Sequence, residues 1–195
     1  MNKQVKELLQ QMKETEAGGI KIYQTALTCV QNDDLKKEWQ EYLDQTKHHH
    51  KVVEGLFAAF KLEDEMTPGR KVVKHIGESL IAAMEMAKKA GDPAAAELVA
   101  CECVTLAETK DHQNWHLLGM VAEKATGDEK KALQAALEEV EDEEDEHLYH
   151  SKGWGRELWI KSLGMKAVLP PPEEEKHVKT AIGAARAEAA RKTMM

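Results

Sequence analysis

The sequence contains little cysteine, little proline and few aromatic residues. Its three cysteines, Cys29, Cys101 and Cys103, are an odd number and lack the spacing of a zinc finger. We therefore expect reduced cysteines rather than a disulfide framework. Aromatic residues make up 5% of the chain and proline only five of its 195 residues, while Ala, Glu, Lys and Leu are prominent. This composition favours helices over sheets.

The sequence also lacks any apolar run close to the ~20 residues that a membrane span requires. Its first residues, MNKQVKELLQQMKE, are polar and amphipathic, which is not the pattern of a secretory signal. The net charge of -8 makes binding to nucleic acid or to an anionic membrane electrostatically unfavourable, and it is compatible with binding cations. We therefore predict a cytoplasmic protein without a nucleic-acid or membrane partner.

Helix boundary signals predict four long helices and two shorter ones. Thr67 before Pro68 and Asp92 before Pro93 have the order of an N-cap followed by proline that is common at helix starts. Three prolines at 170–172 end the regular pattern. The predicted long helices span roughly 4–31, 34–61, 93–125 and 129–163, and the shorter ones about 69–90 and 173–192.

The connections between these helices predict the topology. Short connections join the first long helix to the second and the third to the fourth, so each pair is expected to form an antiparallel hairpin. The segment 62–92 is a long crossover between the hairpins and contains the extra helix. We therefore predict an all-α fold with a helical bundle over residues 1–165. A Pro-rich linker and a C-terminal helix, expected to dock on the bundle, occupy residues 166–195.

The acidic segment DEEDEHLYH contains one Glu and one His that are predicted to be buried. When the apolar stripe of the fourth long helix is traced in alternating steps of three and four, Glu144 and His147 fall on it. Glu143, Glu146 and His150 fall at its flanks or face outward. The pair Glu144-x-x-His147 is therefore the candidate for buried polar chemistry, and the remaining acids are expected to be solvated.

The other long helices also place polar side chains on their stripes. Glu16 lies on the first, His49 on the second, and Glu108 and His112 on the third. Burying a lone carboxylate costs several kcal/mol unless it is paired or coordinates a metal. Because several buried glutamates at one level would repel one another, we predict a metal site between them. Its candidate ligands are Glu16, His49, Glu108, His112, Glu144 and His147.

This ordered set resembles the metal-binding pattern of the ferritin-like superfamily, which includes rubrerythrins, manganese catalases and bacterial stress-associated ferritin-like proteins. That pattern has a Glu from each of helices 1 and 3 and Glu-x-x-His from each of helices 2 and 4. Glu16, Glu108 and Glu144-x-x-His147 match it, and YLDQTKHHHKVVEGLF is similar to the second helix of the stress-associated proteins. The resemblance implies a ferritin-like four-helix bundle.

The second helix departs from this pattern. The position that should carry Glu before His49 is Thr46, and a rotation of the helix by one residue would instead bring in Gln45 and His48. Neither alternative supplies the fourth glutamate of a symmetric dinuclear site. A mononuclear, mixed or zinc site is therefore open as well, since His and carboxylate ligands suit Zn, Mn and Fe.

The resemblance implies a non-haem oxidoreductase with a dinuclear iron or manganese centre. It would act on peroxide, dioxygen or Fe(II), as a peroxidase, catalase or ferroxidase. The alternative is a helical stress or interaction protein, metal-free or stabilised by zinc, that has lost the dinuclear centre. The expected partners are metal ions, a small oxidant and further copies of the chain in a homo-oligomer, a dimer or larger.

Overall fold

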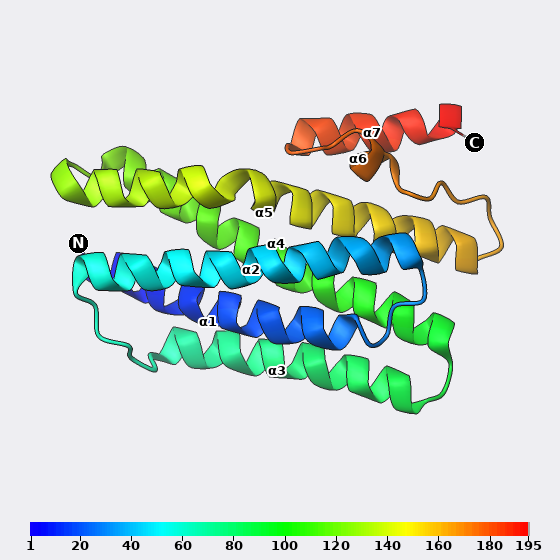
Figure 1. Cartoon of the computed structure of the whole chain (residues 1–195), viewed down its shortest axis with the longest axis horizontal. Helices are drawn as coiled ribbons and strands as arrows, with labels where there is room; N and C mark the ends of the chain where they lie inside the picture. The colour runs from blue at the N-terminus through cyan, green and yellow to red at the C-terminus, as the bar shows by residue number, and fades with distance from the viewer. Residues whose placement is uncertain (195) are drawn as a thin grey trace.

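The computed structural model describes residues 1–194, and this part of the chain is all-helical (Figure 1). The prediction of an all-α fold is confirmed. No helix within residues 1–194 is long and apolar enough to span a membrane. The helices are α1 (Lys3–Ala26), α2 (Asp33–Phe60), α3 (Pro68–Lys89), α4 (Pro93–Lys124), α5 (Gly127–Ser162), α6 (Pro172–Glu175) and α7 (Ala181–Met194).

Side-chain caps explain where three of these helices begin. Thr67 accepts a hydrogen bond from the backbone N–H of Arg70 at the start of α3, and Asp92 accepts one from Ala94 at the start of α4. Asn32 caps α2 in the same way. These bonds satisfy backbone donors that the first turn of a helix otherwise leaves free. The caps and prolines therefore place the helix starts where the sequence predicted them for α3 and α4.

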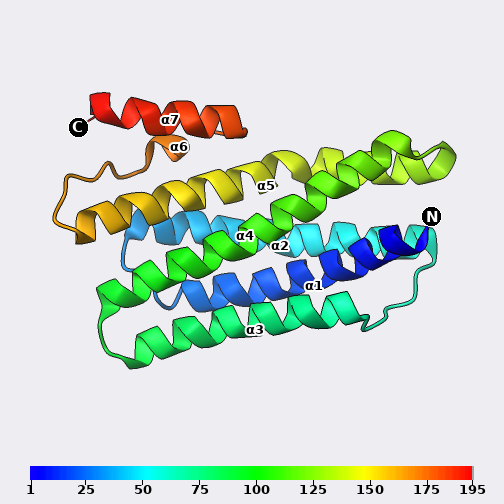
Figure 2. The same cartoon turned by 180° about the vertical axis from the view of Figure 1, so that it is seen from behind.

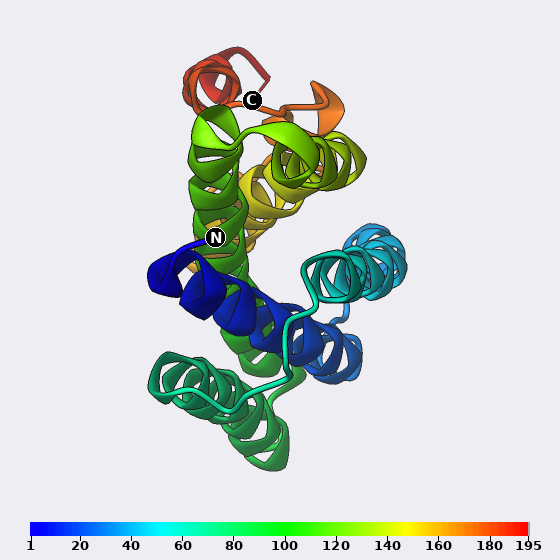
Figure 3. The same ribbon diagram turned by 90° about the vertical axis from the view of Figure 1, so that its left-hand side faces the viewer.

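The four long helices surround a common interior. α1 contacts α2 and α4, and α5 contacts the same two helices, so that the four form a closed ring, seen nearly end-on in Figure 3. α3 lies in the crossover from α2 to α4 and packs against α1 and α4. α3 and α7 lie on opposite sides of the molecule, as both side views show (Figures 1 and 2). The ferritin-like assignment of this bundle stays a prediction.

Two apolar clusters fill the interior on either side of a polar layer. One cluster contains Tyr23, Trp39 and Trp154, and the other contains Leu9 and Leu133. Both clusters draw residues from α1, α2, α4 and α5, which all continue through the polar layer. The apolar burial, at ~25 cal/mol per Å², offsets the cost of burying the polar residues between the clusters.

The prediction of one continuous C-terminal helix is wrong for residues 176–180. The chain leaves helical geometry after α6, and His177 has a left-handed backbone conformation with φ of 49°. Val178 is buried. The Thr180 hydroxyl accepts a hydrogen bond of 3.0 Å from the backbone N–H of Gly183, which caps the start of α7. Local capping and the burial of Val178 thus divide the tail into two helices.

Ion pairs hold the tail against α5. Arg156 of α5 donates to both carboxylate oxygens of Glu173 in α6, at 2.7 and 2.9 Å. Glu157 of α5, with a fully buried side chain, accepts a bond of 2.7 Å from Arg191 of α7. Since removing one partner of a buried ion pair leaves an uncompensated charge, these contacts make detachment of the tail costly.

We expect the docking of α6 to weaken as the pH rises. The side chain of Glu174 accepts a 2.5 Å hydrogen bond from Trp154 Nε1, and burial together with the nearby Glu38 raises the pKa of Glu174 to about 8. Because this pKa lies above the value of 4.5 expected without these contacts, the stabilisation is complete below pH 4.5 and is lost as the pH rises through 8.

Limited proteolysis should therefore cut the tail several-fold faster at pH 9 than at pH 6.5, with cleavage of an unstructured peptide correcting for the protease itself. Glu174→Gln should remove this difference, whereas Glu175→Gln, at an exposed position, should keep it. A cleavage rate that does not change with pH in the unmodified protein would contradict this prediction.

Candidate metal centre

Six buried polar side chains meet in the layer between the two apolar clusters. They come from all four helices of the ring, and each is at most 4% exposed. Their positions on the buried face of each helix explain why they converge. The six are Glu16 of α1, His49 of α2, Glu108 and Asp111 of α4, and Glu144 and His147 of α5.

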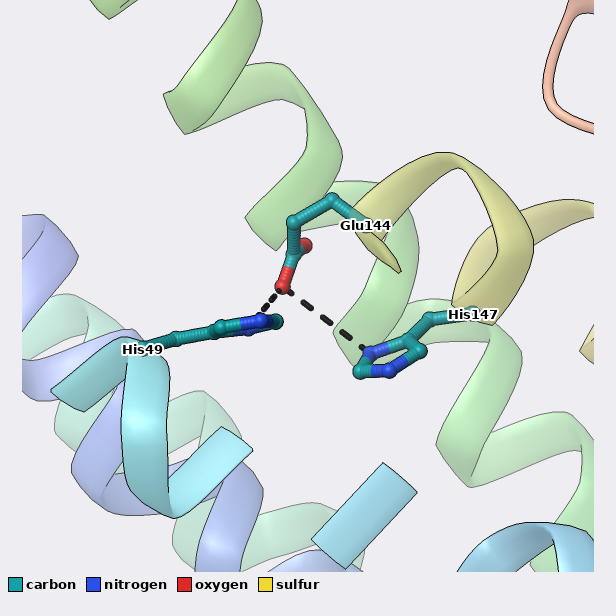
Figure 4. Close-up of side chains that lie close together, drawn as sticks. All are labelled: His49, Glu144 and His147. Carbon is teal, nitrogen blue, oxygen red and sulfur yellow. Dashed lines mark ion pairs between the residues drawn. The ribbon is translucent and has the colours of Figure 1, made fainter. Parts of the chain in front are cut away.

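Two histidines face the same carboxylate of Glu144, as Figure 4 shows. His49 Nδ1 lies 2.8 Å from Glu144 Oε1, and His147 Nδ1 lies 3.9 Å from the same oxygen. Their rings are stacked, with centroids 5.5 Å apart. His147 Nδ1 is also 3.6 Å from Glu108 Oε2. None of these approaches has the geometry of a hydrogen bond, although His49 Nδ1 and Glu144 Oε1 lie at ion-pair distance.

The opposite ring nitrogen of each histidine is held by another side chain. His49 Nε2 lies 2.7 Å from Glu143 Oε2, and His147 Nε2 lies 2.7 Å from Gln45 Oε1. In metal sites, a ligating histidine almost always donates its other ring N–H to a carboxylate or a carbonyl group, which fixes its tautomer and orientation. Both histidines have this arrangement, with Nδ1 directed into the cluster.

A second group of ligand atoms contains only oxygen. Glu16, Asp111 and Glu144 each provide a carboxylate oxygen, and these oxygens lie within 4.8 Å of one another. The other oxygen of Glu16 accepts a 2.9 Å bond from Trp115 Nε1. The cluster therefore contains two overlapping groups, His49–Glu144–His147 and Glu16–Asp111–Glu144, that share Glu144, and Glu108 lies beside His147 of the first group.

The electrostatics of the cluster require a positive charge or protons. Burial, followed by repulsion from Glu144, raises the pKa of both Glu16 and Asp111 well above their ordinary values. Burial lowers the pKa of His49, but the carboxylates of Glu143 and Glu144 outweigh it and raise this pKa to about 10. The cluster contains four carboxylates, those of Glu16, Glu108, Asp111 and Glu144. Within residues 1–194, their ion pairs are those of Glu108 with His147 and of Glu144 with His49 and His147. Without a bound cation, the cluster must therefore hold protons.

The structure brings together five of the six predicted ligands and separates the sixth. His112 is partly exposed, and its Nε2 lies 2.7 Å from Asp145 Oδ1 outside the cluster. In its place, Asp111 faces the interior. A helix has 3.6 residues per turn, so the positions three and four residues after Glu108 lie at either edge of the same face. The packing of α4 against its neighbours places the first of these, Asp111, in the interior.

The rotation of α2 is now determined. His49 is fully buried, whereas the His48 side chain is 53% exposed and its Nε2 lies 3.4 Å from Glu139. Thr46 occupies the position where the ferritin-like pattern has Glu. A Cβ at Gly19 of α1 would lie only 3.1 Å from the methyl group of Thr46. The two helices therefore approach closely here, and a larger residue at position 19 would press against Thr46.

Comparison with known proteins does not assign this cluster to a family. No family model matches the chain, and no curated protein or solved structure gives a significant match. The geometry of the described residues is therefore the basis for inferring a function.

Two buried polar residues near the cluster were not anticipated. Asp111 could have been found as the other edge position after Glu108. His150, expected at a flank or facing outward, is 4% exposed and lies against α2. Its Nδ1 lies 3.0 Å from both Tyr42 Oη and Glu38 Oε1, and the Tyr42 ring packs on His147 at 4.1 Å between centroids. His150 is therefore held between α5 and α2.

An open pocket of about 520 Å³ lies on the surface formed by α2 and α5. Gln45 and Glu143, the partners of the two inner histidines, form part of its wall. These two side chains therefore stand between the pocket and the cluster. The other lining residues are Lys37, Gln40, Glu41, Asp44 and His48.

Glu143→Gln is expected to weaken metal binding by about 10- to 100-fold, because the carboxylate that orients His49 is replaced by a neutral amide. Competition with a chromophoric chelator measures this change. Glu139→Gln is the matched control, since Glu139 is an exposed acid one turn away that pairs with the outer His48. Equal affinities for the two variants would contradict the orienting role of Glu143.

Proposed function

We propose that this chain is a ferritin-like metal-binding protein whose buried Glu–His cluster holds iron or manganese and reacts with peroxide, dioxygen or Fe(II). One observation carries the proposal: unpartnered ligand atoms from four helices point at one another in a buried layer. Most buried side-chain N and O atoms without a hydrogen bond within residues 1–194 belong to the six cluster residues. Buried polar groups are otherwise almost always satisfied, so such a concentration indicates a missing partner.

The charge of the cluster supports two divalent cations. Four carboxylates carry four negative charges when ionised, and two neutral imidazoles add none. Two divalent cations would balance this charge. Carboxylate and imidazole ligands are the set used by non-haem iron and manganese sites.

The side chains have distinct roles in this proposal. Glu144 would bridge the two halves, since both of its oxygens lack a hydrogen bond. His49 and His147 would bind through Nδ1, while Glu143 and Gln45 fix the orientation of the two rings at Nε2. Bound iron or manganese would supply the redox chemistry with the oxidant. The apolar clusters above and below would limit water to the side facing Gln45 and Glu143.

A specific observation favours the alternative of a zinc-stabilised or metal-free helical protein. Thr46 is buried, and its hydroxyl donates a 2.8 Å bond to the backbone carbonyl of Tyr42, so α2 contributes no carboxylate to the cluster. His49, Glu144 and His147 would suffice, with water, for a single zinc ion. In that case the cluster would stabilise the fold without redox activity.

Elemental analysis of untagged protein purified without chelators tests the proposal. We expect about two Fe or Mn per chain, and turnover of peroxide or dioxygen, or oxidation of Fe(II), by the loaded protein. His49→Ala should lower the metal content and the turnover, whereas His48→Ala, at the exposed neighbouring position, should change neither.

About one Zn per chain without turnover would favour the zinc-stabilised alternative. Absence of metal after loading with Fe(II), Mn(II) and Zn(II) would reject the metal site altogether.

A further inference from the structure

We propose that the two halves of the cluster bind different metals, and that Asp111 is a ligand of the second. The half formed by His49, Glu144 and His147 would take a transition metal such as Fe²⁺ or Zn²⁺. The half formed by Glu16, Asp111 and Glu144 would take a hard divalent cation, Mn²⁺ or Mg²⁺. This inference rests on the proposed function because both halves share Glu144.

The oxygen-only half has the geometry of a site rather than of a surface acidic patch. Its three side chains are 0%, 4% and 2% exposed for Glu16, Asp111 and Glu144. Glu16 Oε2, Asp111 Oδ1 and both oxygens of Glu144 have no hydrogen-bond partner. Each comes from a different helix, so the three carboxylates are held together by the packing of α1, α4 and α5.

Among residues 1–194, Asp111 Oδ1 has no hydrogen-bond partner. The adjacent cation, Lys110, donates its hydrogen bond to Asn114 Oδ1 instead. The amide of Asn114 in turn donates to Thr15 Oγ1 at 3.0 Å. The neighbouring polar groups thus satisfy one another, and Asp111 faces the carboxylates of Glu16 and Glu144. A cation between these three groups explains why an acid is placed there.

The donor atoms of the two halves differ in the metals that they favour. Imidazole nitrogen suits Fe and Zn, whereas sites made only of carboxylate oxygen suit Mg, Ca and Mn. The first half provides two imidazole nitrogens and the second none. On α2, Thr46 stands in place of a glutamate and supplies no carboxylate, whereas Asp111 on α4 supplies an additional one. The carboxylates are therefore distributed unequally between the two halves, which makes the centre asymmetric.

Sequential loading of the chelator-treated full-length protein tests this inference. One equivalent of Zn²⁺ is added first, and Mn²⁺ is then titrated while the electron paramagnetic resonance signal of free aqueous Mn²⁺ is recorded. We expect the protein to retain about one Zn and about one Mn per chain. Limiting Zn²⁺ to one equivalent is necessary because Zn²⁺ binds most sites more tightly than Mn²⁺ does.

Asp111→Asn should retain Zn²⁺ and weaken Mn²⁺ binding by at least about tenfold, since one anionic ligand is lost. Asp145→Asn is the matched control, because Asp145 is a partly buried acid that contacts His112 outside the cluster. Glu16→Gln, which retains an acceptor for Trp115, is a second variant with the same expected loss. Circular dichroism establishes that each variant is folded.

Retention of Zn²⁺ without any Mn²⁺ binding, or Mn²⁺ binding that is equal in the unmodified protein and in a folded Asp111→Asn variant, would overturn the inference and leave the proposed function standing. Failure of the unmodified protein to bind either metal would instead reject the proposed function itself.

Discussion

Replacing Glu144 by Gln is expected to remove metal from both halves of the cluster at once. Glu144 belongs to both groups of ligand atoms, and both of its oxygens are buried without a hydrogen bond. Its loss leaves two side chains in each group. We expect the affinity for Fe²⁺ or Mn²⁺ to fall by at least about a hundredfold, more than the 10- to 100-fold typical of residues that only orient a ligand.

Thermal stability provides an independent measurement of this loss. A metal at about 1,000 times its Kd stabilises a folded protein by ~4 kcal/mol, and each kcal/mol corresponds to ~2–4 °C in a chain of this size. The unmodified protein should therefore melt about 10 °C higher with metal than without it. Glu144→Gln should show almost no increase.

Glu146→Gln is the matched control for this variant, since Glu146 is an acid two residues away that pairs with Lys179 at 3.2 Å. It should behave as the unmodified protein does. If Glu144→Gln were folded and still gained the full increase in melting temperature on adding metal, Glu144 would not be the shared ligand.

Without metal, the protein should become less stable as the pH rises from 5.5 to 8. The pKa of His49 is raised from 6.5 to about 10 by Glu143 and Glu144 against the effect of burial. Its contribution is complete below pH 6.5 and is lost as the pH rises through 10. Burial and neighbouring carboxylates raise the pKa of Glu16 and Asp111, so their contribution is complete below pH 3.8 and also declines as the pH rises.

The expected fall in melting temperature is at least about 5–10 °C over this range. A proton that is bound by the folded protein but not by the unfolded chain changes the free energy of unfolding by up to ~1.4 kcal/mol per pH unit. The range ends at pH 8 because cysteines in the unfolded chain begin to ionise above this pH and would add their own effect on stability. With metal bound, the trend should reverse, because metal and protons compete for the same ligand atoms.

The double variant Glu16→Gln, Asp111→Asn measures how much of the pH dependence of the melting temperature comes from these two carboxyl groups. Glu174 acts in the same direction, so part of the slope should persist in the double variant. Thermal denaturation of chelator-treated samples at several pH values measures both slopes. A melting temperature that rises with pH in the metal-free protein, or a double variant with an unchanged slope, would contradict the assignment of bound protons to the cluster.

The sequence by itself determined the number, type and order of the long helices. Caps such as Thr67 and Asp92 act within a few residues, and amphipathic periodicity is a property of each segment. Both can therefore be identified from the sequence without knowledge of the fold. The same periodicity identified Glu16, Glu108, Glu144 and His147 as buried polar positions, and it left His48 and His49 as alternatives on the second helix. All four are buried in the structure.

The tertiary structure alone decided the positions at the edges of those stripes. Asp111 and His112 follow Glu108 by three and four residues, and only the packing of α4 against α1 and α5 determines which of them faces the interior. His150 is buried in a network with Glu38 that the tail helps to close, and the break after α6 depends on the docking of Val178. These outcomes depend on contacts between segments far apart in sequence, which the periodicity of a single helix does not encode.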